Sequence, residues 1–455
     1  MENMIPLNGR IAIVDDQIEQ ALPLMRVFAK NNIPYVFYKG TDPEFLPEQP
    51  ENDIRILFLD LNLLDGRDNQ PKDIRSALFA TIRRIISPNN YPYVLILWSR
   101  QEKEYRNLLE ELFSKDLPQC APIAILNWIK SDFFPNFTDT EENKEDEYRI
   151  LDELKKTLST LPAYSYLMQW ENLAHFSTDE LLKNIFSNAQ PNEWESVANV
   201  IIKSLGKAYM GQHFLEATSE EKIKASLFAL NTVYIDFLDN NLTGHLISSP
   251  KELGEGPSDT GLIEALKADI NYKMHVFTGP CNICEPGTII QYTTDPKNNY
   301  FEELLHKLLS IFQIRLKIKS ETPSILDGIL KKETSSRLHQ IKEEIQHTWF
   351  KIGIVVTPSC DYAQKKKIYD RIVQGVMIES RFFEYINQGD AFYISPTIKY
   401  NDRNYIIILN FNYFITSNLN DEPNCKILFK LRRPILAEVQ SKLARHINRQ
   451  GIINL

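Results

Sequence analysis

Carboxylates stand at the ends of two apolar runs near the start of the chain. Asp15 and Asp16 follow the run from Arg10 to Val14, and Asp60 falls near the end of the run from Ile54 to Leu61. Three carboxylates brought together repel one another unless a cation joins them. Their oxygens suit a hard divalent ion such as Mg²⁺, which keeps several of its waters. If both runs end at one edge, the pattern predicts a magnesium site there.

A hydroxyl and an amine follow two later apolar runs. Ser99 comes after the run Tyr93 to Trp98, and Lys130 comes after the run Ile123 to Ile129. An aspartate carboxylate can attack a phosphoryl group and form an aspartyl phosphate. Lysine and serine side chains can donate to the remaining phosphoryl oxygens and offset the charge that develops. Together with the carboxylates, these two residues indicate phosphoryl transfer to an aspartate.

The first 135 residues alternate between short apolar runs and amphipathic stretches, which predicts strands separated by helices. Strands without polar alternation are typical of a parallel sheet that is covered on both faces. In a doubly wound sheet all strand carboxyl ends open onto one crevice, which would collect the residues named above. The expected strands are 10–14, 35–38, 54–61, 93–98 and 123–129. The first expected helix has a face made of Ile18, Leu22, Met25 and Phe28.

Length and composition suggest a multidomain protein of a reducing compartment. A chain of 455 residues corresponds to about three domains. The 60 acidic and 51 basic residues give a net charge of -9, which argues against a general nucleic-acid-coating role. Five cysteines are too few for a disulfide scaffold of this length. We see no signal peptide and no apolar stretch that would span a membrane, so we expect a cytoplasmic protein.

Changes of texture along the chain predict three domains. Residues 1–137 form the α/β domain, and an acidic stretch at 138–147 separates it from the next one. Helical periodicity dominates 148–245 and predicts an all-helical domain. Residues 246–455 mix helices with strands, which predicts an α+β domain that ends in an amphipathic helix over 434–449.

The C-terminal region carries two weaker candidate sites. Cys281 and Cys284 form a CxxC pair that supplies half of a zinc site, and His275 and Cys360 are candidates to complete it. No second CxxC or CxxH pair exists, so a packed pair without metal is the alternative.

The segment Thr357 to Gln364 is a polar elbow after an apolar strand. There Cys360 and Asp361 are candidates for chemistry, with a buried cysteine and an aspartate helix cap as the alternative.

The N-terminal region resembles the receiver domain of two-component response regulators, which has a flavodoxin-like fold. The matching pieces are Val14-Asp15-Asp16, Phe58-Leu59-Asp60, Ile96-Leu97-Trp98-Ser99 and Trp128-Ile129-Lys130. The resemblance implies that Asp60 is the phosphoacceptor and that Mg²⁺ binds to Asp15, Asp16, Asp60 and the backbone carbonyl of Asn62. It also implies that Ser99 is the switch hydroxyl and Lys130 the phosphate partner. The chain departs from the family in its longer spacings and in the bulky Trp98 before Ser99.

The later segments are similar to those of receiver-containing proteins of bacterial conflict systems, such as the anti-phage system Detocs. The similar pieces are the Thr357–Asp361 elbow and the segment from Ala444 to Arg449. This resemblance implies a phosphoacceptor that receives its phosphoryl group from a partner histidine kinase. The chain would act as a phosphate sink or a signalling component, alongside an effector response regulator. A turnover enzyme is not expected. The alternatives are an effector enzyme or an adaptor that the receiver regulates, with its chemistry or binding around Cys360 and Asp361. A homodimer through the middle helices also stays open.

Overall fold

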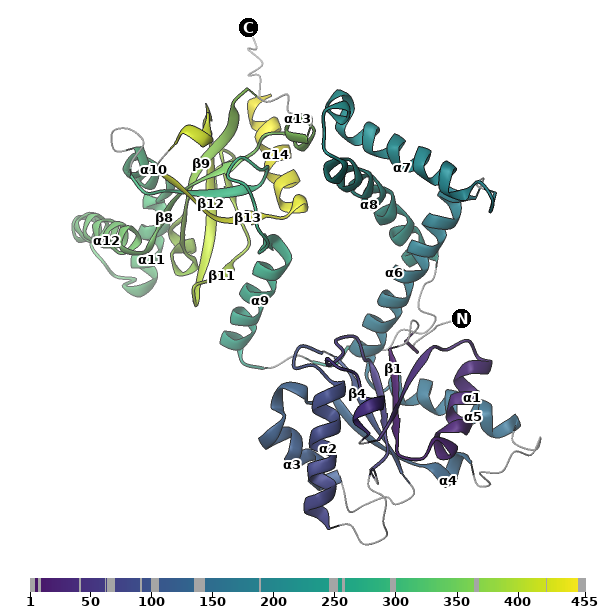
Figure 1. The fold of residues 1–455 in the computed structure, drawn as a ribbon. Helices are drawn as coiled ribbons and strands as arrows, with labels where there is room; N and C mark the ends of the chain where they lie inside the picture. The colour runs from purple at the N-terminus through teal and green to yellow at the C-terminus, as the bar shows by residue number, and fades with distance from the viewer. Residues whose placement is uncertain are drawn as a thin grey trace. The chain divides into compact units, whose positions relative to one another are not determined.

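The chain folds into two compact units. One comprises Met1–Ala198 and Leu230–Gly254, and the other comprises Asn199–Ala229 and Glu255–Leu455. The structure is a computed structural model (Figure 1). It describes residues 5–6, 10–40, 42–61, 63, 70–90, 92–99, 106–134, 144–187, 190–244, 253–255, 258–294, 300–363, 368–422 and 424–448.

The described part of the first unit contains a five-stranded sheet in which all strands are parallel, in the order β2-β1-β3-β4-β5. This order is that of the flavodoxin-like fold. The strands are β1 (Ile11–Asp15), β2 (Tyr35–Lys39), β3 (Ile56–Leu59), β4 (Val94–Ser99) and β5 (Ala124–Ile129). The parallel sheet that the uninterrupted apolar runs predict is therefore confirmed.

Helices cover both faces of this sheet, as Figure 1 shows. Alternate residues of each strand serve the two faces. Ile11 and Ile13 pack with α1 (Ile18–Lys30) and α5 (Lys144–Leu158), whereas Ala12 and Val14 pack with α2 (Pro71–Ile85) and α3 (Arg106–Glu111). Burial on both faces explains why the strands lack polar alternation. Shorter helical turns are Pro43–Phe45, Leu112–Asp116, Pro118–Cys120 and α4 (Lys130–Phe133).

The buried face of α1 differs from the predicted one. Its buried residues are Ala21, Leu24, Val27 and Phe28, while Ile18 is 43% exposed. Two apolar stripes of helical spacing overlap on this helix, so periodicity alone does not select between them. The helix begins at Ile18, directly after the turn that carries Asp16, so its first turn lies at the edge of the sheet.

The middle of the chain is helical, with α6 (Pro162–Phe186), α7 (Trp194–Met210) and α8 (Ser219–Gly244). The start of α6 is anchored on the first sheet, where the Tyr164 hydroxyl donates to the Arg55 carbonyl at 2.6 Å and Glu171 pairs with Arg55 at 3.2 Å. The Ser226 hydroxyl of α8 donates to the Ile202 carbonyl of α7 at 2.7 Å. These helices contribute to both units, so the division into three domains stays a prediction.

The described part of the second unit contains an eight-stranded, antiparallel sheet in the order β10-β12-β9-β8-β7-β13-β6, with β11 beside β12. The strands are β6 (Val276–Phe277), β7 (Thr288–Tyr292), β8 (Phe350–Val355), β9 (Asp370–Glu379), β10 (Phe392–Ile394), β11 (Ile398–Tyr400), β12 (Arg403–Ser417) and β13 (Cys425–Leu431).

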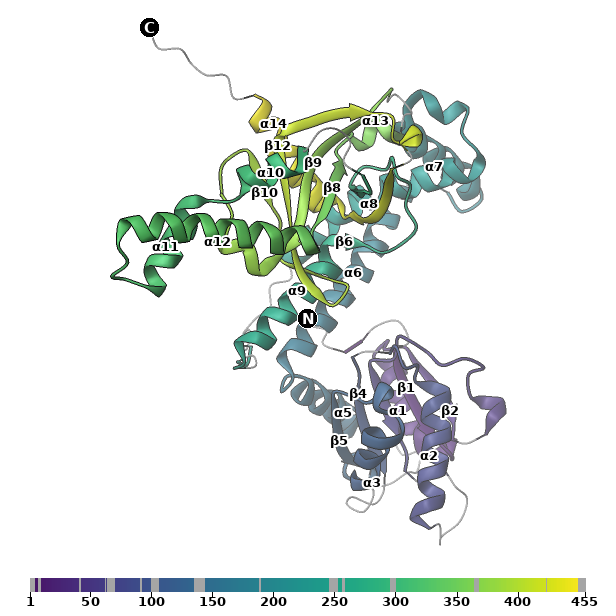
Figure 2. The ribbon, with the colours of Figure 1, turned by 90° about the vertical axis from the view of Figure 1, so that its left-hand side faces the viewer.

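Helices lie on both faces of the second sheet as well. One core contains α10 (Tyr300–Leu308), α11 (Ile311–Glu321) and α12 (Asp327–Thr348), and Figure 2 shows α11 and α12 side by side. The other core contains α14 (Arg433–Ile447) and Tyr272 of α9 (Thr260–His275). Shorter turns are Gly211–Leu215, α13 (Ser359–Ala363), Ser380–Tyr385 and Leu419–Asp421. In the described residues, no helix is both long and apolar enough to cross a membrane.

Two glycines of the second unit give a matched test of its packing. A Cβ on Gly375 of β9 would come within 2.1 Å of the Ile408 carbonyl oxygen in β12, whereas a Cβ on Gly328 of α12 meets nothing within 4 Å. We expect Gly375→Ala to lower the free energy of unfolding by about 2 kcal/mol or more. Gly328→Ala should raise it by up to about 1 kcal/mol, because alanine favours helix. Differential scanning calorimetry checks both, and equal melting temperatures would contradict the packing of β9 against β12.

Candidate functional site

Three strands of the first sheet end in the charged residues that the sequence singled out. Asp15 is the last residue of β1, Asp60 follows β3, and Lys130 follows β5 as the first residue of α4. The Asp60 amide donates to the Val14 carbonyl at 2.8 Å, so β3 stays paired with β1 up to the acidic residue. Parallel strands thus deliver these side chains to one edge of the sheet.

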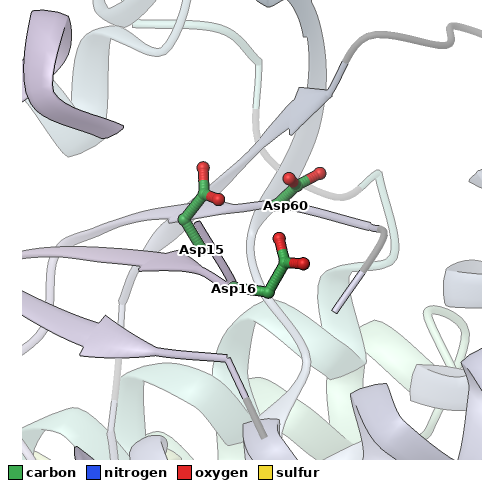
Figure 3. A group of neighbouring side chains, drawn as sticks. All are labelled: Asp15, Asp16 and Asp60. Atoms are coloured by element: carbon green, nitrogen blue, oxygen red, sulfur yellow. The ribbon is translucent and has the colours of Figure 1, made fainter. Parts of the chain in front are cut away.

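The acidic residues Asp15, Asp16 and Asp60 form a compact group, and Figure 3 shows their carboxylates facing a common space. Their ligand oxygens lie within 4.8 Å of one another. Asp15 is fully buried, Asp60 is 4% exposed and Asp16 is half-buried. Over the residues that the structure describes, no other group of three histidine, cysteine or acidic side chains is arranged to hold a metal ion.

Lys130 joins two of these carboxylates. Its Nζ donates to Asp15 Oδ2 at 2.6 Å and to Asp60 Oδ2 at 2.7 Å, and the whole side chain is buried. Gln20 of α1 accepts a third hydrogen bond from the same ammonium at 3.2 Å. No local sequence pattern marks Gln20, because its partner Lys130 lies 110 positions away along the chain.

Among the residues that the structure describes, this group contains three carboxylates and one ammonium. Burial raises the pKa of Asp15 to about 6, the nearby Lys130 opposes this shift, and the Asp60 carboxylate adds to it. One ammonium among three carboxylates leaves charge that a divalent cation would offset. All donors are hard oxygens, which fits Mg²⁺ better than zinc or copper.

An aromatic cluster lies beside the strand ends. The ring of Phe58 is 6.0 Å from Trp98 and 6.0 Å from Trp128, and the Phe133 ring is 5.1 Å from Trp128. Phe58 precedes Asp60 by two positions, and Trp128 precedes Lys130 by two. Packing of these rings therefore fixes the backbone that carries both charged residues.

Gly40 allows β2 to approach the acidic group. It has a φ of +44°, and a Cβ there would lie 3.2 Å from the Asp16 Cα. Glycine adopts this backbone conformation at little cost, and its lack of a Cβ leaves room for Asp16. A single glycine after a strand has many explanations, so the sequence did not identify it.

Two predicted roles fall outside what the structure describes. Asn62 lies outside the described residues, and Ser99 is described only as the last residue of β4, without its side chain. Their assigned roles, a backbone ligand to the metal and a switch hydroxyl, stay predictions.

For the C-terminal elbow, the alternative to a chemical role was a buried cysteine followed by an aspartate that caps a helix. The structure shows neither feature. Cys360 is exposed, and Asp361 lies inside α13 rather than before it. The Cys360 thiol is 3.7 Å from Asp361 Oδ1, and Asp361 lies 3.6 Å from the Arg371 guanidinium. Strand β8 ends at Val355, and the short helix α13 that follows presents its first turn to solvent.

The CxxC pair does not gather further ligands within the described residues. Cys284 is buried, and its thiol lies 3.3 Å from Asn420 Oδ1 as a hydrogen-bond donor. Burial also raises the pKa of Cys281, which disfavours the thiolate that zinc requires.

Neither a family model nor a curated protein sequence matches this chain. The function of the acidic group is therefore inferred from its own chemistry.

Mg²⁺ binding by the acidic group would depend on pH. At a pH below the Asp15 pKa of about 6, a proton on the Asp15 carboxylate competes with the metal. We expect the Mg²⁺ affinity to be roughly tenfold weaker at about pH 5 than at about pH 7.5. Isothermal titration calorimetry of the full chain measures this. The idea fails if the two affinities agree.

Replacing one acidic ligand tests the same group. Asp16→Asn should lower the affinity for Mg²⁺ by about tenfold or more, because replacing even a residue that only hydrogen-bonds to a metal ligand lowers the affinity that much. Asp132→Asn, an exposed carboxylate of α4, is the matched control and should leave the titration unchanged. An equal loss of Mg²⁺ affinity in both variants would mean that the loss comes from the change in net charge and not from a lost ligand.

Removing the buried ammonium should destabilise the first unit. Lys130→Met leaves Asp15 and Asp60 buried without their cation, and we expect a loss of about 3 kcal/mol or more in the free energy of unfolding. Lys39→Met is the control, because Lys39 is half-exposed and lies 4.0 Å from Asp42; its effect should stay within about 0.5 kcal/mol. Urea unfolding followed by circular dichroism compares the two, and similar losses would contradict the structural role of Lys130.

Proposed function

We propose that the first unit is a receiver-like domain in which Asp60 accepts a phosphoryl group in a Mg²⁺-dependent reaction. The observation that carries this proposal is the bridge from Lys130 to Asp15 and Asp60 at 2.6 Å and 2.7 Å, within a group of three carboxylates at the carboxyl edge of a parallel sheet. A nucleophile, a cation and the donor set for a hard metal stand together there.

The reaction follows from these groups. A carboxylate oxygen of Asp60 attacks the phosphorus of a phosphohistidine on a partner kinase. A P–O bond forms, the P–N bond breaks, and the departing imidazole nitrogen takes up a proton. Lys130 donates to a phosphoryl oxygen and balances the charge added at Asp60. When bound by Asp15, Asp16 and Asp60, Mg²⁺ would neutralise phosphoryl oxygens and orient them.

The surroundings of Asp60 support transfer rather than turnover. Asp60 is 4% exposed and follows the strand that carries Phe58 of the aromatic cluster, and we infer that these apolar surroundings slow the hydrolysis of an acyl phosphate. A phosphoryl group held there would serve as a stored signal or as a sink. From the resemblance to conflict-system regulators, we infer that the chain is a cytoplasmic component of bacterial anti-phage signalling. It would receive its phosphoryl group from a histidine kinase in a system that also contains an effector response regulator.

Intact-protein mass spectrometry tests the proposal after incubation with acetyl phosphate and MgCl₂. The wild-type chain should gain the mass of one phosphoryl group, and chelation with EDTA should prevent it. Asp60→Asn should gain nothing, because an amide does not attack phosphorus. Asp53→Asn, an exposed carboxylate just before β3, is the control and should behave as wild type.

Two results would overturn this function. A phosphoryl gain that persists in Asp60→Asn would mean that another residue accepts the group. No gain in a folded wild-type chain that still binds Mg²⁺ would favour an adaptor with a receiver fold.

A further inference from the structure

The ammonium of Lys130 uses all of its N–H donors inside the first unit. A lysine ammonium has three N–H groups and no acceptor. Asp15 Oδ2 accepts from it at 2.6 Å and Asp60 Oδ2 at 2.7 Å, and the third acceptor is the side-chain oxygen of Gln20 at 3.2 Å. Two of the acceptors are therefore charged, and the third, which the proposed function does not use, is neutral.

The first turn of α1 orients the Gln20 side chain. Its Nε2 donates to Gln17 Oε1 at 2.5 Å, which turns its oxygen toward Lys130. The backbone amide of Gln20 donates to the Gln17 carbonyl at 3.0 Å, and the next residue, Ala21, is fully buried in the core. The same turn also reaches the acidic group, because the Gln17 amide donates to Asp15 Oδ1 at 3.0 Å. Gln20 is thus held in a fixed place beside the Lys130 ammonium.

A fixed acceptor beside Lys130 matters when the charge at Asp60 changes. With acetyl phosphate as the donor, an Asp60 oxygen would form a P–O bond, the P–O bond to the acetyl group would break, and acetate would leave. Lys130 then has to donate to a phosphoryl oxygen in place of Asp60 Oδ2. A lysine side chain is flexible and loses entropy when it is held in one conformation. Gln20 and Asp15 are acceptors that Lys130 can keep during this exchange.

We propose that Gln20 is a positioning residue for phosphoryl transfer, which holds the Lys130 ammonium beside Asp60 while one hydrogen bond is exchanged. This inference rests on the proposed function of Asp60. Gln20 acts through Lys130 and contributes no atom that is transferred. A misplacement of about 1 Å in a group that contacts the reacting atoms can slow a reaction about a hundredfold, so the loss of this hydrogen bond should slow the transfer.

The rate of the mass gain with acetyl phosphate and saturating MgCl₂ tests this role in the full chain. Gln20→Met keeps the length of the side chain and removes the acceptor. We expect it to gain the phosphoryl group about tenfold more slowly than wild type, the effect of one hydrogen bond to a charged group. Gln313→Met is the matched control, because it makes the same substitution at an exposed position in the first turn of α11, and it should keep the wild-type rate.

Urea unfolding of the metal-free chain tests the contact without phosphoryl transfer. If Gln20 acts through Lys130, Gln20→Met should lower the unfolding midpoint of the wild-type chain and leave that of the Lys130→Met chain unchanged. A side chain that only fills space would change both midpoints alike. Circular dichroism confirms that each variant is folded before the midpoints and rates are compared.

Three results would overturn the role of Gln20. They are a wild-type rate in Gln20→Met, an equal loss of rate in Gln313→Met, and an effect of Gln20→Met on the midpoint that is the same with and without Lys130. In each case, a phosphorylated wild type would still support Asp60 as the acceptor. A wild-type chain that gains no phosphoryl group would instead overturn the proposed function, and the role of Gln20 with it.

Discussion

Burial of one ammonium between two carboxylates is the interaction on which the first unit depends. Taking Lys130, Asp15 and Asp60 out of water costs several kcal/mol per ion, and only close contacts repay it. Such contacts require three strands, separated by long stretches of sequence, to end at one level. The all-parallel order meets this requirement, because every strand then presents its carboxyl end to the same edge. The parallel order of the strands and the charge pairing at the sheet edge therefore depend on each other.

At this edge, the described charges are three carboxylates and one ammonium, which do not balance. A fully neutralised cluster would hold its lysine firmly and respond little to a new charge. Lys130 donates to Asp15 and Asp60, so under the proposed function a phosphoryl group added at Asp60 would compete for these two hydrogen bonds. Gln20, which also accepts from this ammonium, gives it a neutral partner on α1. This hydrogen bond connects the first turn of α1 to the charged residues at the sheet edge.

Local sequence patterns predicted much of the first unit's fold and of its candidate site. Uninterrupted apolar runs identified five parallel strands, and polar residues at their ends identified Asp15, Asp60 and Lys130, although the spacing before Lys130 is unusually long. What local patterns missed depends on distant partners. The buried stripe of α1 was decided by the sheet beneath it, and Gly40 is explained only by the approach of Asp16. The exposure of Cys360 depends on where a short helix begins, which periodicity does not specify.

The aromatic cluster beneath the sheet edge also makes the first unit its own optical reporter. Trp98 is fully buried and Trp128 is 9% exposed, so both indoles emit from an apolar environment, whereas Trp170 and Trp194 are about half-exposed. The fifth tryptophan, Trp349, is partly buried in the second unit and adds a background to this emission, which a Trp349→Phe variant would remove. Indole emission responds to electric fields, and Phe58 links the two buried rings to the strand that ends at Asp60. A change of charge at that edge would shift the short-wavelength part of the emission spectrum. The spectrum of the unlabelled protein would then follow the state of the site in real time.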